Sequence, residues 1–124
     1  MRKTTITVTG AVGSAGAATA SAISDEVVEG FIRAVHIAYT DTPPATADVA
    51  IVEANESPAM PILTVLNANT DGWFFPMAQA QDPDGVDITN QGAPIPVADT
   101  VKATLTGANA GDGCVVTIVW EPVR

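Results

Sequence analysis

The sequence predicts an all-β fold: a single-domain antiparallel β-sandwich or jelly-roll-like barrel of about 7–8 short strands. Its 124 residues suit one domain. Apolar residues make up 47% and aromatic residues only 5%, and the apolar set is mostly Ala, Val and Ile, which favours strands. Glycine, proline, asparagine and aspartate separate short segments every ~8–12 residues. A jelly roll, an immunoglobulin-like sandwich and a small barrel all fit this pattern.

The first half of the chain contains three predicted strands. Residues 4–9 alternate, with Thr4, Ile6 and Val8 on one face, and predict a half-buried strand after a mobile basic start at residues 1–3. Residues 10–24 are small and predict a loop followed by a weak strand. Residues 28–40 form the longest apolar stretch. Their β-branched content and the stop at Pro43-Pro44 favour a strand, with a helix as the alternative.

The second half continues the series of short strands and turns. The predicted strands cover residues 48–54, 61–66, 101–106 and 114–120. We expect 48–54 to form a hairpin-like unit with 28–40, and the last two strands to form a closing hairpin. Residues 82–99 are rich in proline and glycine and predict a long surface excursion with short edge strands at most.

Charge and cysteine content exclude several classes of function. Five Lys and Arg against 14 Asp and Glu give a net charge of −9, which argues against nucleic-acid partners. The sequence shows neither the apolar run of a signal peptide nor one of membrane-spanning length, so we expect no membrane partner. The lone Cys114 excludes an intramolecular disulfide and predicts a buried, inert thiol.

Three groups of residues raise the question of enzymatic or metal chemistry. Residues 9–16 have the T-G-x-x-G-x-x-G spacing of a dinucleotide loop, but no amphipathic helix pattern follows. His36 is the only histidine, and no nucleophile motif accompanies it. Residues 82–87 gather three aspartates without the ligand spacing of a calcium loop. We therefore predict a non-enzymatic protein with no cofactor and no metal.

Two carboxylate pairs also have the composition of acid and base groups. They are Glu26 with Glu29, and Glu53 with Glu56. Nothing in the sequence marks these side chains as buried. We interpret them as solvated faces.

The segment Trp73-Phe74-Phe75 concentrates half of the six aromatic residues directly after a turn. Such a cluster is either the main plug of the core or an interface anchor, because large rigid rings supply contact area at a small entropic cost. Trp120 ends the last strand and is predicted to be core.

The order of segments carries a family resemblance. It rests on residues 38–49 (A-Y-T-D-T-P-P-A-T-A-D-V), on residues 62–76 with their N-A-N-T-D-G-W-F-F-P stretch, and on residues 97–102 (V-A-D-T-V-K). Together these segments resemble the short β-rich decoration, or cement, proteins of tailed bacteriophages. The resemblance spans nearly the whole chain.

The resemblance implies a structural protein on the outer capsid surface of a virion. Such proteins bind the phage major capsid protein, often as homo-trimers, and stabilise contacts between its subunits. The resemblance supplies no catalytic residues, so the candidate interface residues are chosen from the chain itself. They are Arg2, Lys3, Trp73, Phe74, Phe75, Pro94 and Pro96.

The second hypothesis is a β-sandwich module of a phage fibre that binds a glycan or receptor through Trp73 and acidic loops. A glycan site needs exposed aromatic rings beside polar groups, so the exposure of Trp73 discriminates between the hypotheses. An enzyme that uses the glycine-rich loop at residues 9–16 ranks third.

Overall fold

The computed structural model describes residues 1–123, which form β-strands and no helix. The strands are β1 (Arg2–Val8), β2 (Ala18–Ile23), β3 (Val28–Thr40), β4 (Asp48–Glu53), β5 (Pro61–Val65), β6 (Gly72–Phe74), β7 (Ala78–Gln81), β8 (Asp87–Ala93), β9 (Ile95–Asp99), β10 (Val101–Ala108) and β11 (Gly113–Pro122). The predicted all-β class is confirmed. The structure has more strands than the expected 7–8 because β6, β7, β8 and β9 add short ones.

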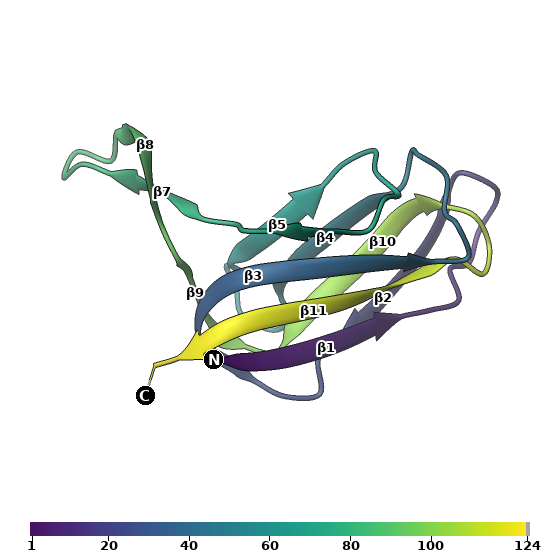
Figure 1. Ribbon diagram of the computed structural model, residues 1–124, viewed down its shortest axis with the longest axis horizontal. Coiled ribbons are helices and arrows are strands. Elements are labelled where there is room, and N and C mark those ends of the chain that lie inside the picture. Colours follow the sequence, from purple (N-terminus) through teal and green to yellow (C-terminus); the bar gives the residue numbers. More distant parts are fainter. Residues whose placement is uncertain (124) are drawn as a thin grey trace.

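Two curled antiparallel sheets face each other across the core (Figure 1). The first sheet has the order β1-β11-β3-β6, and β9 also pairs with β3. The second sheet has the order β2-β10-β4-β5. β7 and β8 form a separate two-stranded sheet that lies outside this sandwich.

The core consists of the alternate residues of facing strands. On β1 the buried residues are Thr4, Ile6 and Val8, as the alternation predicts. The largest fully buried side chains are Ile6, Ile32, Ile37, Ile51, Leu105, Ile118, Val8, Val28, Val35, Val49, Val101 and Val116. Trp120 and Cys114 are buried as expected, and burial raises the pKa of the Cys114 thiol to about 11.

Both predicted hairpins are wrong. β3 pairs with β11, β6 and β9, whereas β4 pairs with β10 and β5, so the Pro43-Pro44 connection crosses between sheets. β10 and β11 likewise lie in opposite sheets. A period of two specifies which face of a strand is buried and does not specify its partner, so the sequence pattern left the pairing open.

The chain start is also part of the sandwich. Arg2 and Lys3 belong to β1, where they pair with Trp120 and Val119 of β11. This placement replaces the expected mobile arm at residues 1–3. Arg2 and Lys3 are held in place because the β1–β11 ladder already begins at Arg2.

Two buried carboxylates tie loops to the edges of the sandwich. Glu53, expected to be solvated, is buried and accepts hydrogen bonds from the backbone N–H groups of Met60 and Ala98. Asp99 is also buried and accepts from the backbone N–H groups of Asn55 and Glu56 at 2.6 and 2.9 Å. Both carboxylates satisfy backbone donors that the sheets leave unpaired.

Acid should loosen the loop that Asp99 holds. The backbone hydrogen bond from Asn55, with those from Glu56 and Thr100, lowers the pKa of Asp99 from 3.8 to about 2. A carboxyl whose pKa is lower in the folded state stabilises the fold above its unfolded pKa and loses that contribution as the pH falls from about 4 to 2. Urea unfolding at pH 6 and pH 2.5 should show a smaller pH effect for Asp99→Asn than for wild type. Equal pH effects in the two proteins would contradict this role.

Tyr39 offers a stabilising substitution. Its hydroxyl is buried and has no hydrogen-bond partner within residues 1–123, and burial is the main cause that raises its pKa. A buried polar group without a partner costs about 1–3 kcal/mol. Tyr39→Phe should therefore raise the free energy of unfolding by about 1 kcal/mol in urea titration. A loss of stability in Tyr39→Phe would show that the hydroxyl is hydrogen-bonded after all.

Candidate functional site

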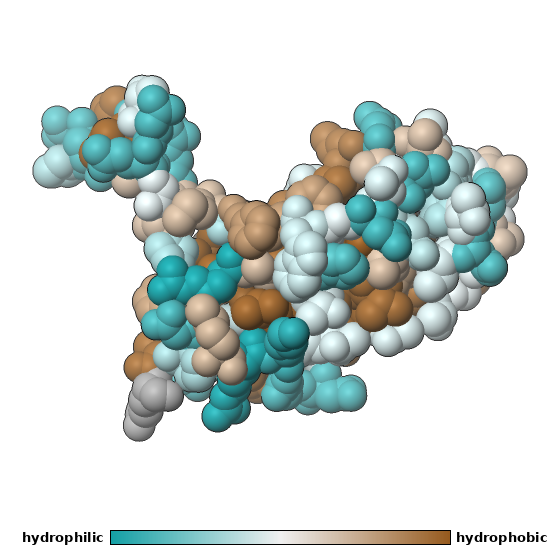
Figure 2. Space-filling view, viewed as in Figure 1, coloured by the Kyte–Doolittle hydropathy of each residue, from teal (hydrophilic) through white to brown (hydrophobic). Residues whose placement is uncertain are grey.

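An arm projects from the edge of the first sheet (Figures 1 and 2). We define the arm as residues 75–94, which contain β7 and β8. β6 pairs with residues 35–37 of β3 and β9 pairs with residues 28–32, so the arm leaves the sheet between them. Within residues 1–123, β7 and β8 pair only with each other, and nearly all their side chains are exposed. An isolated two-stranded hairpin is at best marginally stable in water.

The hairpin of the arm is also incompletely paired. Its pairs are Ala78 with Ala93, Gln79 with Gly92 and Gln81 with Asp87, and the register shifts between them. Residues 88–91 therefore have no opposing residue in this ladder, and Asn90 has a positive φ of 63°. Unpaired backbone groups on an exposed strand are a template for pairing with another chain.

The aspartates at the tip of the arm shape its turn. One carboxylate oxygen of Asp82 accepts hydrogen bonds from the backbone N–H groups of Asp84 and Val86 at 2.9 and 3.0 Å. This is the ordinary capping of a turn by aspartate. The described residues contain no group of three His, Cys, Asp or Glu side chains arranged to hold a metal ion.

An apolar stripe runs from the first sheet onto the arm. It consists of Trp73, Phe75 and Met77, which are 52%, 70% and 60% exposed and which we call the anchor stripe. Phe74, between them, is partly buried and packs against the core. Exposed Trp, Phe and Met side chains are enriched at the centres of protein interfaces. The sequence left open whether this cluster is core or interface. Phe74 packs on the core, whereas Trp73 and Phe75 are exposed and available for contact.

An apolar groove adjoins the base of the arm. It has a volume of about 290 Å³ and lies between the edge strand β5 and the arm, lined by Met60, Ile62, Leu63, Met77 and Ile95 among others. β5 pairs only with β4 in the described structure, so its other edge is open beside this groove. An open strand edge with flexible methionine side chains suits an extended partner segment.

The outer face of the first sheet aligns four side chains across its strands. Thr5 pairs with Thr117, Thr117 with His36, and His36 with Trp73, in β1, β11, β3 and β6. The His36 and Trp73 rings lie 4.9 Å apart between centroids, at 55°. Thr5 and Trp73 are exposed, while Thr117 and His36 are half-buried. We call this set the threonine–aromatic row.

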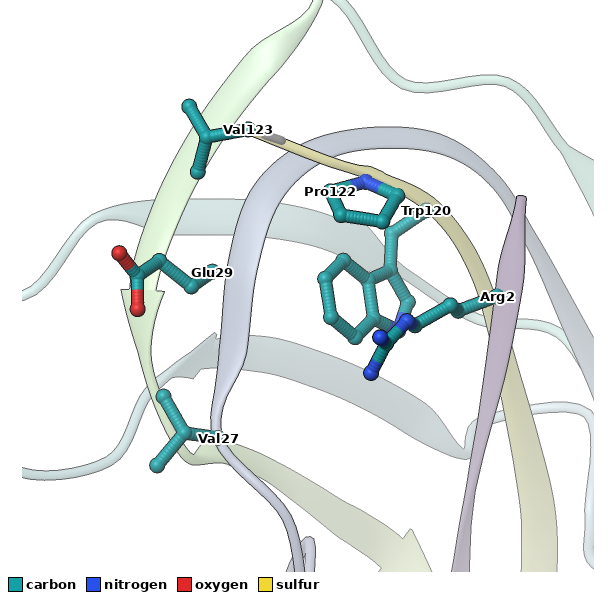
Figure 3. A pocket seen from close by; sticks show the side chains of 6 residues that line it. All are labelled: Arg2, Val27, Glu29, Trp120, Pro122 and Val123. Atoms are coloured by element: carbon teal, nitrogen blue, oxygen red, sulfur yellow. The ribbon is translucent and has the colours of Figure 1, made fainter.

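Basic residues gather at one end of the first sheet. Arg33 forms an ion pair with Glu121 at 2.9 Å, and Lys3 is exposed on β1. The Arg2 guanidinium lies 5.7 Å from the centre of the Trp120 ring, at the mouth of a pocket of about 300 Å³. Figure 3 shows Arg2 pointing over this ring, while the Glu29 carboxylate points away from it. The Trp120 indole N–H donates to the Thr4 hydroxyl, so the ring is held in place.

The residues that suggested enzymatic chemistry in the sequence lie in turns and strands, where they shape or stabilise the fold. Gly10, Gly13 and Gly16 all have positive φ, and the following segment is β2, so the helix N-terminus that a dinucleotide loop needs is not formed. His36 packs on Trp73 within a strand. Glu26 accepts a hydrogen bond from the Thr4 hydroxyl. Each of these groups thus has a structural role in the described chain.

The remaining predicted interface residues lie near the arm. Pro94 is half-buried where the arm returns to the sheet, and Pro96 is exposed on β9 opposite Phe31.

In residues 1–123 there is no helix of the length and apolarity required to cross a bilayer.

Sequence reasoning missed Met77 and the two threonines of the row. Alternation from Trp73 through Phe75 gives the signal for Met77, because every second residue of an extended segment shares a face. Thr5 and Thr117 were recognisable as outward-facing positions. Their alignment with His36 depends on strand register, which no local pattern contains.

Comparison with known proteins leaves the family open. No protein-family model and no curated protein matches the chain. A solved structure of a mutant family 29 carbohydrate-binding module, made to probe ligand recognition by such modules, has a TM-score of 0.43 and 11% sequence identity. The match covers 90% of this chain and 67% of the other. The function is therefore inferred from the chain's own residues.

Proposed function

We propose that this chain is a non-enzymatic binding protein that docks on neighbouring protein subunits through its arm. In the finer form of the proposal, the partner is the major capsid protein of a tailed bacteriophage. Copies of the chain then decorate the outer surface of the virion, as trimers, and stabilise contacts between capsid subunits.

One observation carries this proposal: the hairpin of the arm lies outside the sandwich, and each side chain of the anchor stripe is more than half exposed. Phe75 and Met77 are 70% and 60% exposed. Burying each such side chain on a partner would contribute about 1.5–3 kcal/mol. A partner strand would also complete the backbone hydrogen bonding of residues 88–91.

The charge supports a protein partner and argues against nucleic acid. A net charge of −9 repels a phosphate backbone and keeps the free protein soluble at high local concentration. The aspartates at the arm tip extend this acidic character to the part of the chain that reaches outward. We therefore expect the docking surface of the partner to carry basic residues.

Removing two of the three anchor-stripe side chains should weaken docking while the sandwich stays folded. The variant Phe75→Ser with Met77→Ser should lower affinity for empty expanded phage heads by at least about tenfold, because two apolar contacts are lost. Co-sedimentation with heads from the same source measures this affinity. Val12→Ser, at another exposed apolar position (78%), is the matched control and should bind as wild type does. Undiminished binding of the double variant would overturn the proposal.

A specific observation favours a second candidate, a glycan-binding module. Trp73 is half-exposed and lies against His36 on the outer face of the first sheet. A glycan site requires an exposed aromatic ring, and the exposed ring of Trp73 meets this requirement. A glycan array tests this candidate independently of head binding, and the two kinds of binding can occur on one molecule.

A further inference from the structure

We propose that the outer face of the first sheet binds an acidic oligosaccharide along the threonine–aromatic row, with one sugar ring stacked on Trp73. This inference rests on the binding function proposed above, in its glycan form, and specifies the ligand class and the residues.

The row is a straight line of side chains, which suits a linear ligand. Its residues lie on four adjacent strands, so it extends about 14 Å across a curved but open face. It thus offers several successive contacts, as a chain of sugar rings does.

The chemistry of the row matches the two kinds of surface that a sugar presents. The apolar C–H face of a sugar ring packs on an aromatic ring, and Trp73 is 52% exposed and supported from one side by His36, 4.9 Å away. The hydroxyls of Thr5 and Thr117 both donate and accept hydrogen bonds, as sugar hydroxyls do. An aromatic ring at one end and hydroxyls at the other orient the ligand.

Charge complementarity identifies the sugar as acidic. Lys3 lies two residues from Thr5 along β1, on the same face, and has no ion pair among residues 1–123. Arg33 lies at the same end of the sheet, and its pairing with Glu121 leaves Lys3 as the free cation beside the row. In a chain of net charge −9, such a cation is a local exception that a sugar carboxylate would match.

The exposed indole also supplies the signal for the test. The chain has two tryptophans, of which Trp120 is 3% exposed and Trp73 is 52% exposed. An array of neutral, sialylated and uronic-acid-containing oligosaccharides gives the first screen. The strongest acidic hit and its neutral counterpart are then titrated while the fluorescence of Trp73 and its quenching by iodide are recorded.

Binding should shield Trp73 and depend on each part of the row. Trp73→Ala should weaken affinity by about tenfold or more, and Thr117→Val by about threefold to tenfold. Lys3→Gln should reduce the preference for the acidic over the neutral sugar by about two- to fivefold. Lys102→Gln, the same charge change on β10 of the second sheet, should leave that preference unchanged.

Two outcomes would overturn the inference. One is an array on which no acidic oligosaccharide binds. The other is a hit whose affinity is the same in Trp73→Ala and Thr117→Val as in wild type. Head binding is measured separately with Thr117→Val, which lies away from the arm. Thr117→Val should keep wild-type head binding while it weakens sugar binding. Loss of head binding with intact sugar binding would count against both the arm and the row, whereas loss of head binding together with sugar binding would count against the arm alone.

Discussion

Gly30→Ala should lower the free energy of unfolding by about 3 kcal/mol, the largest stability effect that we expect from adding one methyl group. A Cβ atom at Gly30 would collide with the backbone carbonyl of Glu121 on β11. The obstacle is backbone in a central pair of strands, so no side-chain rotation relieves it. β3 also pairs with β9 at this residue, and both neighbouring strands would have to move.

The measurement is urea or thermal unfolding beside a matched strand glycine. Gly72 lies in β6, and a Cβ there would meet nothing within 4 Å. Gly72→Ala should therefore stay within about 0.5 kcal/mol of wild type. If Gly30→Ala were as stable as Gly72→Ala, the close approach of β3 and β11 at this point would be wrong.

The sequence predicts strands well because alternation is a local property. Residues 4–9 place Ile6 and Val8 on one face, and both are buried on β1. Pairing depends on distant segments, and here the pattern failed: 28–40 and 48–54 are neighbours in sequence but lie in different sheets. The Pro43-Pro44 turn is compatible with a hairpin and with a crossing between sheets, so local chemistry does not decide between them.

In the candidate site, too, local features could be predicted from the sequence, whereas features that depend on distant segments could not. The aromatic cluster was evident from composition, and strand alternation separates the core-facing Phe74 from the exposed Trp73 and Phe75. The proline- and glycine-rich excursion at residues 82–99 was predicted as surface, and residues 82–94 are largely exposed. The prediction is wrong for its end, because β9 pairs with β3 and buries Ile95 and Val97 in the core. The β7–β8 hairpin was not predicted, because β7 alternates only two small alanines with glutamines and β8 is largely polar. The burial of Glu53 was missed for a related reason: its hydrogen-bond donors belong to Met60 and to the distant Ala98.

The arm itself should be dispensable for folding and indispensable for docking. Replacing residues 78–93 by a short Gly/Ser linker should leave the free energy of unfolding within about 0.5 kcal/mol of wild type. β7 and β8 pair with no strand of the sandwich in the described chain, and shortening a surface connection costs little. The same change should weaken binding to phage heads by on the order of a hundredfold, because the open strand edge and the acidic tip are lost together.

A replacement of equal kind elsewhere shows whether the effect belongs to the arm. Exchanging loop residues 41–46 (D-T-P-P-A-T), which connect β3 to β4 and are mostly exposed, for a Gly/Ser linker should leave head binding unchanged. Unfolding curves and co-sedimentation are measured on all three proteins. An armless chain that no longer folds would make the arm part of the stable fold. An armless chain that still binds heads as wild type does would move the docking surface to the sandwich, where the threonine–aromatic row is the next surface to alter.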